Sequence, residues 1–262
     1  MARGRRHDVS ALVERNIERA RREASQEIGE PGPAPTLPYV AFSRATGIDA
    51  RPIASAIADR LSFRVLDHEL VAEIAREAYV PEDVVRTYDQ NPHDQLEQMI
   101  ADLPFMHLFS EDEYVRHLTR VVRRFAAQGR VVLVGHAASM VLPAGSGVRV
   151  FLTAPLEVRT RWTAITDGID LDEARRRVDA EDERRRIFSE RHFGFAPDSL
   201  HVTDLVIDVT AHGPEAVADH VVEALAERLA LHASPDRLSL KEVLHGRAMR
   251  AVVHSNRGPH LL

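Results

Sequence analysis

Five short apolar runs, each separated from the next by an amphipathic segment, constrain the fold of this chain more than any other feature. The runs occupy residues 38–42, 63–66, 131–134, 148–152 and 204–209. The third run, Val-Val-Leu-Val, is apolar at every position, as expected of a strand buried on both faces of a sheet. The alternation of strands with helices predicts an α/β fold: a doubly wound, parallel, five-stranded sheet within three layers.

The segments between these runs have the spacing of helices. Ile53, Ile57 and Leu61 recur at i, i+4 and i+8 after Pro52, which suits the first turn of a helix. Asp170 with Glu173 resembles a capping box at the start of a later helix. We expect helices over residues 52–61, 67–79, 111–128, 155–167, 170–194 and 214–231.

The ends of the chain differ in composition from this block. Residues 1–36 predict a charged N-terminal arm that ends in a proline-rich linker. Residues 37–231 predict the folded domain, and residues 232–262 predict a polar C-terminal tail. Four histidines in the tail lack the spacing of metal ligands, and we expect no metal site there.

Composition excludes several classes of function. The formal net charge of −6 gives no general reason to expect nucleic-acid binding. Cysteine is absent, which excludes disulfides and thiolate metal sites. No apolar run reaches the roughly 18 residues of a membrane helix, and no apolar segment follows the first arginines, so a cytoplasmic location is expected. Lys241 is the chain's single lysine, so chemistry elsewhere must use arginine.

The turn after the first strand, residues 43–52, is where a doubly wound sheet binds phosphate, because backbone N–H groups and a helix N-terminus meet there. The usual pattern is G-x-x-x-x-G-K-[ST]. Here Gly47 is the turn's only glycine, Arg51 stands in place of the lysine, and Pro52 replaces the hydroxyl residue. Taken alone, the segment also fits an ordinary βα turn. Guanidinium groups bind phosphate well, so Arg44 and Arg51 are the expected phosphate contacts.

Several segments, in order, resemble the cytidylate kinase-like family. Phe42-Ser-Arg-Ala-Thr-Gly47 followed by Ile53-Ala-Ser-Ala-Ile-Ala resembles that family's S-R-x-x-G-S-G-G-x-x-I-A pattern. The other matching segments are Val65–Leu70, Val131–Ala137, Val148–Arg159 and Asp204–Thr210. The resemblance covers residues 38–230 and implies the nucleotide kinase form of the P-loop NTPase fold.

The resemblance implies ATP-dependent phosphoryl transfer to a nucleoside monophosphate, most simply CMP or dCMP. It implies ATP as donor and Mg²⁺ held largely through water, with Asp67 and Asp49 as the nearest carboxylates. The implied donor contacts are Arg44, Thr46, Gly47, Asp49 and Arg51, and the implied acceptor contacts are Asp67 and His136.

Residues 170–194 lie where this family keeps an arginine-rich lid over the transferring phosphate. The preferred catalytic residues are Arg184, Arg186 and Arg191, with Arg159 as a further phosphate contact. Glu181 and Asp182 stand four residues before Arg185 and Arg186, so the charge pattern also fits a solvated, salt-bridged helix.

The chain departs from the family pattern in the loop glycines, replaced by Ile48, Asp49 and Ala50, and at His136, where the family has an arginine. Two hypotheses follow. The first is an active nucleotide kinase with a divergent loop. The second is a weak or inactive kinase-like module that binds nucleotide, or a partner protein, for regulation. The expected partners are nucleotides, and the helical segment 83–108 is long enough to contribute the face of a homodimer.

Overall fold

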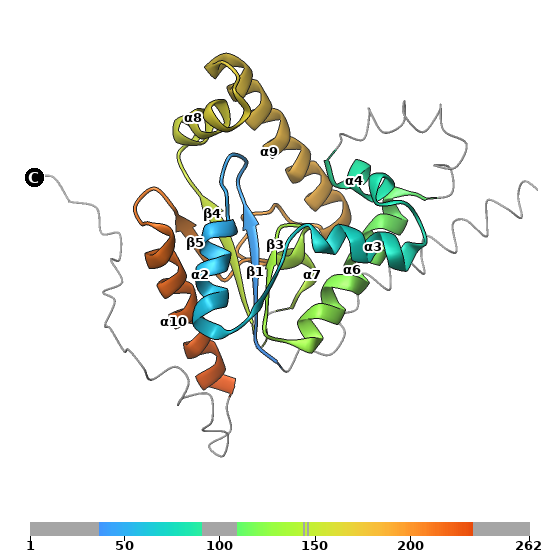
Figure 1. Cartoon of the computed structure of the whole chain (residues 1–262), viewed down its shortest axis with the longest axis vertical. Coiled ribbons are helices and arrows are strands. Elements are labelled where there is room, and N and C mark those ends of the chain that lie inside the picture. The colour runs from blue at the N-terminus through green and yellow to red at the C-terminus, as the bar shows by residue number, and fades with distance from the viewer. Residues whose placement is uncertain (1–36, 91–108, 144, 146, 233–262) are drawn as a thin grey trace, which may run out of the picture.

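The computed structural model describes residues 37–90, 109–143, 145 and 147–232. Its centre is a sheet of five parallel strands: β1 (Tyr39–Arg44), β2 (Arg64–Leu66), β3 (Val131–Val134), β4 (Val148–Thr153) and β5 (Leu205–Asp208). The strand order is β2-β3-β1-β4-β5 (Figure 1). The predicted doubly wound parallel sheet is confirmed.

Helices cover both faces of this sheet. They are α2 (Arg51–Leu61), α3 (Glu69–Ala78), α4 (Glu82–Gln90), α6 (Glu111–Gln128), α7 (Ala138–Val141), α8 (Leu156–Asp167), α9 (Leu171–Phe193) and α10 (Pro214–His232). In Figure 1, α2 and α10 lie on one side of the sheet and α3 and α6 lie on the other. Helices α8 and α9 pack on each other and extend past the edge where β1 ends.

Strand β1 explains why the apolar runs are continuous. Tyr39 and Ala41 belong to the core under α3 and α6, whereas Val40 and Phe42 belong to the core under α2 and α10. All four side chains have 0% exposure. A strand buried on both faces cannot alternate apolar with polar residues, so the unbroken apolar pattern follows from the three layers.

Helix α6 begins and ends as its sequence dictates. Ser110 and Glu113 form a capping box, in which the Glu113 backbone N–H donates to Ser110 Oγ at 3.2 Å and the Ser110 N–H donates to Glu113 Oε2 at 2.8 Å. Gly129 ends the helix with a φ of +69°. The predicted bounds, 111–128, are those observed.

A buried ion pair joins β4 to the start of β5. Arg149 donates to both carboxylate oxygens of Asp204 at 3.0 Å, and their side chains are only 8% and 12% exposed. Arg228 of α10 lies 3.0 Å from the same carboxylate. Burial would raise the pKa of Asp204, but hydrogen bonds from Arg149 and Arg228 outweigh burial and hold that pKa below its ordinary value.

Three predicted segments fall on residues that are not described. The arm at 1–36 lies outside the described residues, as do residues 233–262 of the tail and the greater part of the segment 83–108. Among the residues described, no helix has the length and apolar character to cross a membrane.

Candidate functional site

The turn that joins β1 to α2 packs tightly on α8. Gly47 has a φ of +89°, which L-residues other than glycine rarely adopt. A Cβ atom there would stand 2.8 Å from both the Arg159 carbonyl oxygen and Thr163 Oγ1. The turn therefore needs glycine at this position both for its conformation and for its approach to α8.

Arg51 and Asp49 form an ion pair at the N-terminus of α2. The Arg51 backbone N–H and its Nε both donate to Asp49 Oδ1, at 3.0 and 2.8 Å, and Nη2 donates to Oδ2 at 2.8 Å. Hydrogen bonds from the Arg51 guanidinium lower the pKa of Asp49. The pair is exposed, so a phosphate that engages Arg51 would share it with this carboxylate.

Asp182 of α9 binds the same turn from the other side. Its Oδ1 accepts the backbone N–H of Thr46 at 2.9 Å, and its Oδ2 lies 2.7 Å from Arg159 Nη1. Arg159 also donates to the carbonyl oxygens of Thr46 at 3.2 Å and Ala154 at 3.0 Å. Its side chain is 11% exposed. These contacts tie α8, α9 and the turn together.

Three cavities surround this turn. The loop cavity, about 530 Å³, is lined by the turn from Arg44 to Arg51 together with residues of α8 and α9. The Trp162 cavity, about 350 Å³, has a lining that includes Ile48, Ile53, Trp162, Val209, His212 and Pro214. The aromatic cavity, about 290 Å³, includes Tyr88, Tyr114 and Phe188 in its lining.

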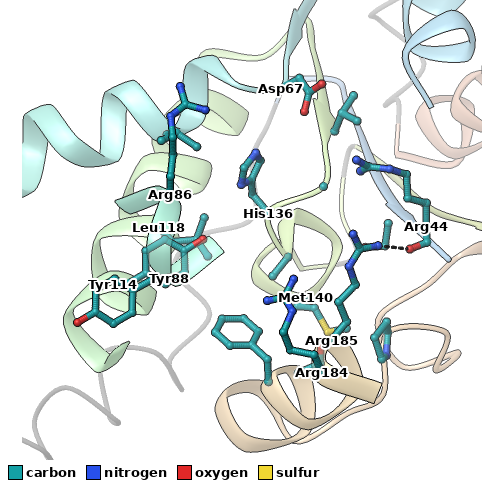
Figure 2. Close-up of a pocket in the computed structure, with 18 of the residues that line it drawn as sticks. Arg44, Asp67, Arg86, Tyr88, Tyr114, Leu118, His136, Met140, Arg184 and Arg185 are labelled. Atoms are coloured by element: carbon teal, nitrogen blue, oxygen red, sulfur yellow. Dashed lines mark hydrogen bonds between the residues drawn. The ribbon is translucent and has the colours of Figure 1, made fainter. Parts of the chain in front are cut away.

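Basic side chains from three elements and from the turn after β3 line the aromatic cavity. Figure 2 shows Arg86 of α4 across the space from Arg44 at the end of β1, with Arg184 and Arg185 of α9 below and His136 between them. The Arg44 guanidinium passes so close to Gly135 that a Cβ there would lie 2.9 Å from Arg44 Nη1. A side chain at this position would displace the end of the flexible Arg44 side chain.

The backbone after β3 is unusual. Gly135, His136 and Ala137 have φ values of +75°, +49° and +49° in succession. Non-glycine residues rarely adopt this region, and such strain concentrates at binding and catalytic sites. The turn carries His136 into the aromatic cavity, as Figure 2 shows.

The loop cavity and the aromatic cavity adjoin. Four residues line both: Arg44, Asp67, Val134 and Arg185. Arg185 Nη1 donates to the Arg44 carbonyl oxygen at 3.1 Å, and Arg185 Nε donates to Glu181 at 2.9 Å. Two guanidinium groups and one carboxylate therefore stand where the cavities meet.

The structure brings together some of the predicted site residues and separates others. Arg184 lines the aromatic cavity with His136, and Asp67 lines both cavities. Arg186 is exposed and lies 2.7 Å from Glu183 and 2.6 Å from Glu190. Arg191 is exposed and lies 3.2 Å from Glu111. Neither Arg186 nor Arg191 lines any of the three cavities. Their catalytic role stays a prediction.

Arg185 was not among the residues singled out from the sequence, although it lines both cavities. The spacing of residues along α9 bears on this position. The buried residues of α9 are Ala174, Val178 and Ser189, and Arg185 falls on the same helical face because it stands seven residues after Val178 and four before Ser189. The apolar spacing of Ala174 and Val178 indicates this face, and the packing of α9 in the structure identifies Arg185 on it. Arg86 and the aromatic residues of the cavity were also missed.

The donor set fits a weakly coordinated Mg²⁺ better than a tightly held metal. Among the described residues, no group of three histidine or carboxylate side chains could hold a metal ion. Of the four carboxylates that line the loop cavity, Asp49, Asp167 and Glu181 are paired with arginines, which leaves Asp67. Mg²⁺ often keeps several waters and takes one carboxylate plus phosphate oxygens.

Comparison with known proteins agrees with this geometry. A family model, that of the cytidylate kinase-like family, matches residues 39–211. Cytidylate kinases from Ignicoccus hospitalis and Methanopyrus kandleri are 35% and 29% identical to 41% and 42% of this chain. The chain spans 63% and 64% of those proteins, which is less than two thirds of their length.

A solved structure of a protein from Eubacterium ventriosum gives a TM-score of 0.54 at 16% identity, covering 74% of this chain and 100% of that one, a likeness of fold alone. The family match extends from β1 through β5, and so includes every element that lines the loop cavity. The chain belongs to the cytidylate kinase-like family.

Proposed function

We propose that this protein is a nucleoside monophosphate kinase that transfers a phosphoryl group from ATP to a CMP-like or dCMP-like acceptor. The observation that carries the proposal is the meeting of the loop cavity with the aromatic cavity at Arg44 and Arg185. A phosphoryl group that passes between a donor in one cavity and an acceptor in the other must cross this junction.

The donor fits the two cavities on the α8 side. Its phosphates would lie along the loop cavity, near the N-terminus of α2, where the helix dipole favours negative charge. Its base would enter the Trp162 cavity, whose apolar lining suits an aromatic ring. Ile165, which is 80% exposed, adds to the apolar lining of this cavity.

The acceptor fits the aromatic cavity. Its phosphate would lie toward Arg44, Arg184 and Arg185, and Tyr114 and Phe188 supply aromatic surface for its base. His136 stands between these groups and adds a positive charge only when it is protonated. Phosphoryl transfer needs positioning and charge neutralisation rather than a covalent intermediate, and this lining can supply both.

Arginine takes the place of the usual loop lysine. The chain's single lysine, Lys241, lies outside the described residues. Arg44 reaches the junction over Gly135 and Arg185 reaches it from α9. Bound Mg²⁺ would neutralise charge on the donor phosphates, with Asp67 of the loop cavity as its protein carboxylate.

A second candidate function, a weak or inactive nucleotide-binding module that acts in regulation, is favoured by one observation. Two carboxylates already pair with arginines beside the turn. Asp49 pairs with Arg51, and Asp182 pairs with Arg159 and accepts the Thr46 backbone N–H. Negative charge beside the phosphate site opposes the binding of a triphosphate. Such a module would bind nucleotide without turnover.

Calorimetric titration tests the shared part of both candidates. We expect ATP, CMP or dCMP to bind with measurable heat in the presence of Mg²⁺. The absence of binding by any of these nucleotides, with and without Mg²⁺, would exclude both the kinase and the nucleotide-binding module.

A further inference from the structure

Asp182 lies where an anion would bind the turn. One carboxylate oxygen accepts the Thr46 backbone N–H at 2.9 Å, and the other pairs with Arg159 at 2.7 Å. A backbone N–H and a guanidinium are the donors that phosphate oxygens prefer. The carboxylate belongs to α9, 136 residues further along the chain than Thr46, so it reaches the turn only through the fold.

We propose that Asp182 is an internal substitute for a donor phosphate, which a phosphate-bearing ligand displaces from Thr46 and Arg159. The inference rests on the proposed use of the turn as the donor-phosphate site. It assigns to Asp182 a positioning role: in the absence of ligand, Asp182 holds Arg159 and α9 on the turn, and a bound phosphate takes over these donors.

Two further observations support a ligand site rather than a purely structural contact. The side chain of Thr163 lines the loop cavity and is 6% exposed, yet its hydroxyl has no hydrogen-bond partner among the described residues. The buried hydroxyl of Thr46 is likewise unpartnered in the described part of the chain. Buried hydroxyls are normally satisfied, and a phosphate with its waters would supply partners for these two.

The position of Asp182 also links the turn to catalysis. Arg185 lies one turn of α9 further along from Asp182 and donates to the Arg44 carbonyl oxygen. An exchange of Asp182 for phosphate would therefore change how firmly α9 holds Arg185 at the junction of the two cavities. The contact of Asp182 with the turn, which competes with the donor phosphate, thus also positions Arg185, a candidate catalytic residue.

The test compares Asp182→Asn with Asp179→Asn. Asp179 is three residues earlier on α9, exposed, and paired with Arg175 at 2.8 Å, so its substitution removes the same charge without touching the turn. The probe is inorganic tripolyphosphate, which carries no base. Affinity is measured by calorimetry, and the Thr46 amide is followed by NMR to locate the binding.

We expect Asp182→Asn to bind tripolyphosphate at least about fivefold more tightly than the unmodified protein, because one nearby negative charge is removed and Arg159 is released. Asp179→Asn should bind as the unmodified protein does, and the Thr46 amide signal should shift on titration. Equal or weaker binding by Asp182→Asn, or a Thr46 signal that does not move, would overturn the inference.

The outcomes separate this inference from the proposed function. If the protein phosphorylates CMP but Asp182→Asn binds tripolyphosphate no better, the inference fails and the proposed function stands. If Asp182→Asn gains affinity but neither protein transfers a phosphoryl group, the inference stands and the kinase activity fails.

Discussion

The guanidinium of Arg185 donates a 3.1 Å hydrogen bond to the carbonyl oxygen of Arg44, and the two residues line both the loop cavity and the aromatic cavity. A residue of α9 thereby touches the end of β1. In a kinase, this contact would keep two positive charges beside the transferring phosphate without a loop lysine. The contribution of Arg185 to turnover can be measured against that of its neighbour, Arg186.

Arg185→Ala should lower turnover about 100-fold or more, because the substitution removes charge that would stabilise the transition state. Arg186→Ala tests the expectation, drawn from the family resemblance, that Arg186 is catalytic. Since Arg186 is exposed and paired with Glu183 and Glu190, we expect it to lower turnover less than about threefold. The kinetics of the two variants with ATP and CMP decide which arginine acts. A larger loss for Arg186→Ala would contradict the site described above.

Gly47→Ala should destabilise the fold more than Gly168→Ala. Both glycines have positive φ, at +89° and +66°, so both substitutions introduce backbone strain. A Cβ at Gly47 also meets Arg159 and Thr163 atoms at 2.8 Å, whereas a Cβ at Gly168 meets nothing within 4 Å. Urea unfolding should show a loss of about 3 kcal/mol for Gly47→Ala and about 1 kcal/mol for Gly168→Ala. Equal losses of unfolding free energy would show that the packing of the turn on α8 does not require glycine at position 47.

Asp204→Asn should lower the free energy of unfolding by about 3 kcal/mol, because it leaves the buried Arg149 guanidinium without its anion. The pKa of Asp204 is lower in the folded than in the unfolded state, so its stabilisation is present above the unfolded pKa, about 4, and is lost as pH falls through the folded pKa. The free energy of unfolding, measured as pH falls, should therefore decrease less steeply in Asp204→Asn than in the unmodified protein. This decrease is the acid limb of the stability curve.

Asp198→Asn is the control for this substitution, since Asp198 lies six residues before Asp204 and is exposed. Its stability and its acid limb should match those of the unmodified protein. An unchanged acid limb in Asp204→Asn would show that the buried pair does not carry the pH dependence.

Trp162 should report donor binding directly. It is the chain's only tryptophan and it lines the cavity proposed for the donor base. Because a stacked base changes the environment of the indole, ATP should change Trp162 fluorescence more than tripolyphosphate does. Equal changes would mean that the base lies elsewhere.

The sheet could be predicted from the sequence because its pattern is local. Val131–Val134 is apolar at every position, and a strand buried on both faces requires that pattern. The capping box of Ser110 and Glu113 likewise fixed the start of α6 at its observed residue. These features depend on neighbours within a few positions.

The site could be predicted only in part because it depends on contacts between distant segments. Arg44 ends a strand and Asp67 and His136 follow strands, and the carboxyl ends of parallel strands meet at one edge of the sheet. Which arginine of α9 faces that edge depends on how the helix packs. The contact of Asp182 with Thr46 spans 136 residues and cannot be read from either segment alone.

The central claim is phosphoryl transfer at the junction of two cavities, and an ADP-release assay tests it most directly. The assay uses the full chain with ATP and Mg²⁺ across CMP, dCMP, UMP and AMP. We predict ADP release that depends on CMP or dCMP and is lost in both Arg44→Ala and Arg185→Ala. Nucleotide binding without acceptor-dependent ADP release would contradict the kinase and leave the regulatory module.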